Sequence, residues 1–174
     1  MSVLRTVETA ERIIKKILEF MVFVLFAAMS TLVFAQVCIR FLTTSSLTWS
    51  EELSRFILIW LIYMASILAY SDKIHIVVDA LVSILKGRLS FAVQLINRAC
   101  VFVFAVCITL GAVEFMPTTA FQESPANGII MSYVYAAIPI SMVFIALIAL
   151  KEICLLLRGG ARPDASPDAG EEAP

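Results

Sequence analysis

Four long runs without a charged residue dominate this chain of 174 residues. About 20 mainly apolar helical residues cross the hydrocarbon core of a bilayer. Two of the runs reach that length unaided, and the two shorter ones reach it when their charged ends lie at the lipid headgroups. The runs are Phe20 to Ile39 with 20 residues, Phe56 to Ser71 with 16, Ala99 to Val113 with 15, and Ser124 to Leu150 with 27.

The composition also indicates a membrane protein. Hydrophobic residues make up 61% of the chain and charged residues 16%, against about 45–50% and about 25% in soluble domains. We therefore predict an all-α integral membrane protein with four transmembrane helices plus an amphipathic interfacial helix. The predicted parts are a cytoplasmic N-terminal segment (1–16), a four-helix membrane domain (17–157, with spans at about 17–39, 51–71, 95–116 and 129–151 and an amphipathic arm at about 72–87), and a disordered cytoplasmic tail (158–174).

The distribution of positive charge predicts the orientation. Lys and Arg number 4 before the first charge-free run, 2 between the first and second runs, 4 between the second and third, 0 between the third and fourth, and 3 after the fourth. Cytoplasmic segments carry the excess of Lys and Arg, so both termini are expected in the cytoplasm. A cleaved signal peptide is the rival interpretation of the first run, but that run exceeds the 7–15 apolar residues of a signal and three more spans follow it.

The start of the second span holds the densest polar cluster. Thr48-Trp49-Ser50-Glu51 fits a capping box with Thr48 at the N-cap. Glu51 and Glu52 lie four and three residues before Arg55, a spacing that predicts a local ionic cluster at the outer headgroups. This cluster could bind an anion or coupling ion, contact another subunit, or remain solvated as acids that complement the helix dipole. Trp60 lies about 16 Å deeper than Trp49 along the helix axis. Its side chain is therefore expected to anchor the packing of this helix.

The segment after the second span has helical amphipathic periodicity. His75 and Asp79 share its polar face, while apolar residues such as Val77 and Leu81 lie opposite. A helix of this kind is too charged to cross the bilayer and lies in the interface. The i,i+4 pair of His75 and Asp79 could be a proton relay or an ordinary ion pair on a wetted face.

Single polar residues and prolines mark the last two spans. Arg98 is expected to extend to the inner headgroups, and Glu114 is either a functional acid or a residue that reaches outer water. Pro139 should kink the fourth span near its middle.

No cofactor, metal site or catalytic site is expected. The single histidine cannot build a His-rich metal site or a haem held between two histidines. There is also no Gly-rich phosphate loop and no nucleophile elbow, so the chain is not expected to be an enzyme. The four cysteines show no CxxC spacing and are interpreted as small apolar fillers. A net charge of −1, without a basic patch, argues against nucleic acid as a partner.

Several of these residues occur together, and in the same order, in a known family. Over residues 15 to 157 the chain resembles the small membrane (DctQ-type) subunit of tripartite ATP-independent periplasmic (TRAP) transporters. The residues that carry the resemblance are Arg40, Trp49, Glu51, Glu52, Arg55, Trp60, His75 and Asp79, and we predict that the same residues lie at subunit-interface or docking positions.

The resemblance implies secondary transport across the bacterial inner membrane. In such systems a periplasmic binding protein delivers an organic anion, of the carboxylate or sialic acid class, to a membrane complex driven by a sodium gradient. The large multi-span permease subunit holds the substrate and moves as an elevator, and the small subunit supports it as a scaffold among the membrane lipids. The alternative function is a membrane-anchor or assembly subunit of a respiratory or signalling complex.

Overall fold

The computed structural model describes residues 2–43, 47–72 and 88–159. These residues form helices and connecting loops, and a single isolated β-bridge between Glu123 and Ile130 is the only β-type pairing within the described ranges. The helices are α1 (Ser2–Thr43), α2 (Thr48–Ser71), α4 (Arg88–Thr119), α5 (Met131–Tyr135) and α6 (Ala137–Gly159). The prediction of an all-α protein is therefore confirmed, whereas the amphipathic arm at 72–87 lies almost entirely outside the described residues.

Four stretches are long and apolar enough to cross a membrane, as predicted. They are Arg12–Leu42 with 31 residues, Thr48–Ser71 with 24, Leu89–Thr119 with 31 and Met131–Leu157 with 27. At about 1.5 Å per residue these stretches measure about 36 to 46 Å. Each is therefore longer than the hydrocarbon core of about 30 Å.

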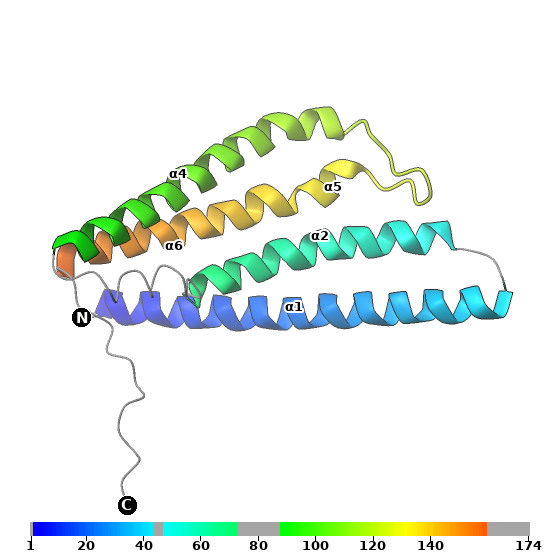
Figure 1. The fold of residues 1–174 in the computed structure, drawn as a ribbon, viewed down its shortest axis with the longest axis horizontal. Helices are drawn as coiled ribbons and strands as arrows, with labels where there is room; N and C mark the ends of the chain where they lie inside the picture. The colour runs from blue at the N-terminus through cyan, green and yellow to red at the C-terminus, as the bar shows by residue number, and fades with distance from the viewer. Residues whose placement is uncertain (1, 44–46, 73–87, 160–174) are drawn as a thin grey trace, which may run out of the picture.

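The helices form two antiparallel pairs (Figure 1). In one pair α1 packs against α2, and in the other α4 packs against α6 and the short α5. The pairs meet through α2, which contacts α5 and α6. Leu47 and residues 120–130 lie at one end of the bundle, here called the loop end, and the opposite end, where α1 begins and α6 finishes, is called the terminal end (Figure 1).

The core lies toward the terminal end, where all four long helices contribute to it. Ala105 of α4 and Ala149 of α6 are both 0% exposed, so these two helices approach each other closely. The buried cluster comprises Leu18, Met64, Ile67, Tyr70, Ala105, Ile145 and Ala149. Trp60 is partly buried against this cluster, as expected for a packing anchor.

The last span is broken, but not at Pro139 near its middle, where the kink was predicted. The helix is interrupted at Ala136, between α5 and α6, three residues before Pro139. A proline ring clashes with the carbonyl four residues earlier, and for Pro139 that carbonyl belongs to Tyr135. The interruption therefore falls one turn before the proline, near the loop end of the span.

The predicted capping box at the start of α2 does not form. Leu47, not Thr48, occupies the N-cap, and no side chain caps this helix. The first turn is instead closed by the Leu47 carbonyl, which accepts bonds from the Ser50 backbone N–H and the Ser50 hydroxyl, both at 3.0 Å.

Candidate functional site

The loop between α4 and α5 is folded into a small hairpin. The Ser124 N–H donates to the Ile129 carbonyl at 2.9 Å, and the Gly128 N–H donates to the Ser124 carbonyl at 2.9 Å. Gly128 has a φ of 64°, a left-handed conformation that glycine adopts without steric cost. The turn directs several hydrogen-bond donors toward the start of α2.

One carboxylate of α2 receives these donors. Glu52 Oε2 accepts from the Ser124 hydroxyl, from the Ala126 N–H at 3.1 Å and from the Asn127 side-chain amide at 3.5 Å. The same Asn127 nitrogen donates to the Trp49 carbonyl at 2.8 Å. Hydrogen bonds to an ionised carboxylate are stronger than neutral ones. These residues form the loop-end polar cluster (Trp49, Glu52, Ser124, Ala126 and Asn127), which fastens the loop to α2.

The loop-end polar cluster replaces the ionic cluster that the sequence predicted. Within the described ranges, no ion pair joins Arg55 to Glu51 or Glu52, and both Arg55 and Glu51 are exposed. The i,i+3 spacing brings Arg55 near Glu52 along the helix. However, the loop hairpin offers Glu52 three fixed donors, whereas Arg55 would have to immobilise a long, flexible side chain.

The other predicted site residues lie apart from this cluster or outside the residues that the structure describes. Arg40 is exposed in the last turn of α1, at the same end of the bundle. Trp49 is 48% exposed, so its ring is free to contact a partner or lipid while its carbonyl holds Asn127. His75 and Asp79 fall in 73–87, outside the described residues.

A second polar cluster, at the terminal end, joins α4 to α6. Arg98 Nε lies 3.1 Å from Glu152 Oε2, and the two side chains are only 20% and 16% exposed. Arg98 Nη1 also donates to Gln94 Oε1 at 3.3 Å. The buried Tyr70 of α2 lies beside Arg98 and Glu152, within hydrogen-bonding reach of the Glu152 carboxylate. This terminal-end polar cluster (Tyr70, Gln94, Arg98 and Glu152) therefore connects three helices.

In the terminal-end polar cluster Arg98 pairs with a residue of the chain itself, whereas its side chain was expected to extend to the headgroups. Its guanidinium instead turns toward α6, because Glu152 offers a partly buried carboxylate at the same depth. A signal for this pairing was present: both residues adjoin charge-free runs, and successive antiparallel spans bring those ends together. A further pair, Lys15 with Asp72, links α1 to α2 at the same end, but its side chains are 39% and 38% exposed, so its contribution is small.

Both polar clusters link helices, and their side chains bond mainly to one another. Among the side chains that the structure describes, no group of three or more His, Cys, Asp or Glu could hold a metal ion. A third polar contact, from the Gln36 amide to the Ser54 hydroxyl at 2.9 Å, joins α1 to α2. These polar contacts hold the helices and the α4–α5 loop together.

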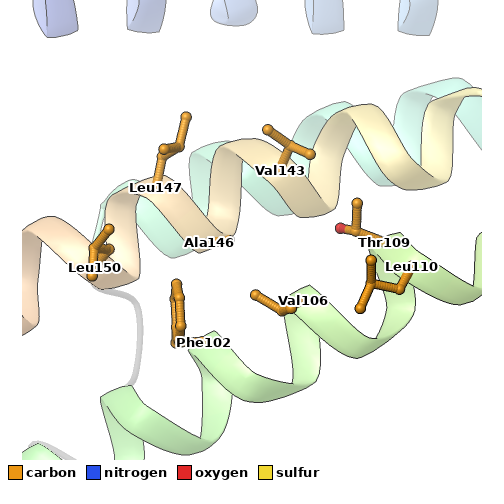
Figure 2. A pocket seen from close by; sticks show the side chains of 8 residues that line it. All are labelled: Phe102, Val106, Thr109, Leu110, Val143, Ala146, Leu147 and Leu150. Atoms are coloured by element: carbon orange, nitrogen blue, oxygen red, sulfur yellow. The ribbon is translucent and has the colours of Figure 1, made fainter. Parts of the chain in front are cut away.

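An apolar groove lies between α4 and α6 and opens outward (Figure 2). Its volume is about 160 Å³. Four residues from each helix line it: Phe102, Val106, Thr109, Leu110, Val143, Ala146, Leu147 and Leu150. The Thr109 hydroxyl donates to the Ala105 carbonyl at 2.8 Å and so presents no free donor to the groove. The groove therefore suits an apolar occupant.

Comparisons with known proteins agree on one family. The family model described as "Tripartite ATP-independent periplasmic transporters, DctQ component" matches residues 29–159. A Haemophilus influenzae protein named as a TRAP transporter small permease protein is 33% identical over 128 residues, which cover 74% of this chain and 78% of that protein. A second protein of the same organism, named in the same way, is 26% identical over 140 residues, 80% of this chain and 87% of that protein. The C4-dicarboxylate TRAP transporter small permease protein DctQ of Vibrio cholerae is 29% identical over 94 residues, 54% of this chain and 40% of that protein.

Proposed function

The chain belongs to the DctQ component family of TRAP transporters, and from this premise we propose that it is the fixed scaffold beside a large, elevator-type permease subunit. As a small permease subunit it is a multi-pass membrane protein. In this proposal the transporter imports an organic anion with a sodium gradient, and the anion is delivered by a periplasmic binding protein. The small subunit binds neither the anion nor sodium.

The main support for this proposal is that polar side chains at both ends of the bundle bond to other parts of the same chain. At both ends of the bundle, carboxylates of one helix are bonded to groups on another, Glu52 to the α4–α5 loop and Glu152 to Arg98. The outward faces of α1 and α4 are apolar and exposed, with Phe20 68%, Phe34 71% and Val103 58% exposed. Internal fastening with apolar outer faces suits a rigid part that is itself covered by lipid and by another membrane subunit.

The proposed orientation places the loop end in the periplasm. It rests on the excess of Lys and Arg in the segments that adjoin the terminal end. In this orientation Arg40, Trp49, Glu51 and Arg55 lie at the outer surface, where they can contact the large subunit or the docking binding protein. His75 and Asp79 are proposed to brace the large subunit from the cytoplasmic interface.

The substrate is proposed only by class. The relative from Vibrio cholerae is named for C4-dicarboxylates, which supports a carboxylate, and sialic acids belong to the same class of organic anions. In this scheme the binding protein and the large subunit determine the choice.

Affinity purification of the full chain from mild detergent, followed by mass spectrometry, tests the proposal. We expect a large permease in equal amount, and sodium-dependent uptake of a labelled organic anion when the purified complex and its binding protein are placed in vesicles. Recovery of the chain alone, or with redox or signalling subunits, would refute the proposal. The second of these results would favour the anchor or assembly function.

A further inference from the structure

One face of α4 has no partner within the described chain. Among the described helices α4 packs mainly against α5 and α6, and the face turned away from them is exposed over the whole span. At 100° per residue, positions spaced alternately by four and three residues share one face of a helix. The members of this face, here called the α4 seam, are Ile96, Cys100, Val103, Cys107, Leu110 and Glu114.

The α4 seam alternates large and small side chains. Ile96, Val103 and Leu110 are 62%, 58% and 66% exposed. Cys100 and Cys107, between them, are also exposed. Large residues that alternate with small ones at this spacing form the knobs and holes by which a second helix packs. In a membrane, small residues at a helix surface allow such close approach.

Glu114 is the one charged member of the α4 seam. It is exposed and lies five residues before the end of α4, about 7.5 Å along the axis. The helices that touch α4 cannot neutralise it, because the basic residues of α5 and α6, Lys151 and Arg158, lie at the terminal end of α6. No hydrogen bond or ion pair reaches Glu114 from the part of the chain that the structure describes. A carboxylate on a lipid-facing helix is costly unless a partner satisfies it.

The α4 seam continues into the groove between α4 and α6. Leu110 belongs to both, and on the α6 side Val143 and Leu147 are 44% and 58% exposed (Figure 2). Together they form one apolar surface with a single negative charge near the loop end. The exposed face of α1 differs, because no charged residue occurs between Glu19 and Arg40.

We propose that the α4 seam and its groove are the surface on which a transmembrane helix of the large permease subunit docks. That helix places an apolar side chain in the groove and a Lys or Arg against Glu114. The inference rests on the proposed function and deepens it, since it names the contact face and the chemistry of the partner. A lipid acyl chain could fill the groove, but it brings no positive group to Glu114.

The test is the amount of large permease that co-purifies with the tagged full chain. Cys107→Trp blocks a small position of the α4 seam, and Glu114→Lys reverses its charge. Each should reduce the ratio of permease to small subunit about tenfold, the effect of losing a close interhelical contact of about 1.4 kcal/mol. The matched control is Ala27→Trp, on the exposed face of α1, which should leave the ratio unchanged.

The outcomes separate this inference from the proposed function. Unchanged ratios for both α4 variants, with permease recovered by the unmodified chain, would overturn the docking surface and leave the transporter function standing. An equal loss with Ala27→Trp would also overturn it, by moving the contact to α1. Since the α4 seam lies outside the core of the chain, its substitutions should not disturb folding. Each variant must therefore elute from size exclusion in detergent as the unmodified chain does. No permease with the unmodified chain would instead refute the proposed function, and the docking surface with it.

Discussion

Removing the guanidinium of Arg98 should destabilise the helix bundle measurably. Arg98→Ala leaves the Glu152 carboxylate partly buried without its cation, with Tyr70 of α2 beside it. Breaking a fully buried pair by removing one partner costs about 3–5 kcal/mol, whereas an exposed pair contributes about 0–1 kcal/mol. The Arg98 and Glu152 side chains are 20% and 16% exposed, so they are mostly buried but lie at the end of the bundle. We therefore expect a loss of about 2 kcal/mol.

The assay is the midpoint of thermal denaturation in detergent. It is obtained from the fraction of the chain that stays monodisperse after heating. For a chain of this size, 1 kcal/mol lowers the midpoint by about 2–4 °C, so Arg98→Ala should lower it by about 4–8 °C. Arg55→Ala is the matched control, because Arg55 is exposed and has no ion pair within the described ranges; it should shift the midpoint by less than about 2 °C.

A double variant distinguishes pairing from a general loss of side-chain packing. Arg98→Ala combined with Glu152→Ala removes the uncompensated charge and should recover most of the lost stability. A midpoint for Arg98→Ala within about 1 °C of the unmodified chain, or a double variant as damaging as the sum of the single changes, would refute the reasoning.

Two further predictions concern the loop end and the core. Glu52→Ala should free the α4–α5 loop, because Ser124, Ala126 and Asn127 lose their common acceptor. Amide hydrogen exchange over 120–130 should then speed up about tenfold, as a loss of about 1.4 kcal/mol predicts. The control, Glu51→Ala, should leave the exchange rate unchanged. Ala149→Leu should separate α4 from α6, because Ala149 is 0% exposed, and overpacking of about 1–3 kcal/mol should lower the denaturation midpoint by about 2–12 °C; Ala28→Leu, on the exposed surface of α1, is the control, and an equal effect of the two changes would contradict the assigned core.

The sequence was sufficient for the helices but not for the contacts between them. Charge-free runs determine where a chain can cross a bilayer, and the four predicted spans therefore appear as four long apolar helices. The partners of Glu52 were missed because they lie 72 to 75 residues away along the chain, and pairing at that separation depends on helix rotation and on the shape of the loop. Local spacing pointed to Arg55 instead, since i,i+3 neighbours are the only partners that a single helix reveals.

Two of the other departures from the predictions have physical reasons of their own. Glu152 as the partner of Arg98 depends on which faces α4 and α6 turn toward each other, and the two residues lie 54 positions apart in the chain. A break in the last span was predicted at Pro139, and the structure has it at Ala136. A proline disturbs the helix at the carbonyl four residues before it rather than at its own position.

The lengths of the spans connect this protein to the thickness of its bilayer. Every candidate span, from 24 to 31 residues, exceeds a hydrocarbon core of about 30 Å, and a helix relieves such hydrophobic mismatch by leaning. The helices of this bundle cannot lean independently, because α2 is held to the α4–α5 loop at one end and lies against the Arg98–Glu152 pair at the other. The bundle therefore leans as one body, by an angle that shorter lipid chains increase and longer ones decrease. The acyl-chain length of the surrounding lipids thus sets how the loop end is presented above the membrane plane.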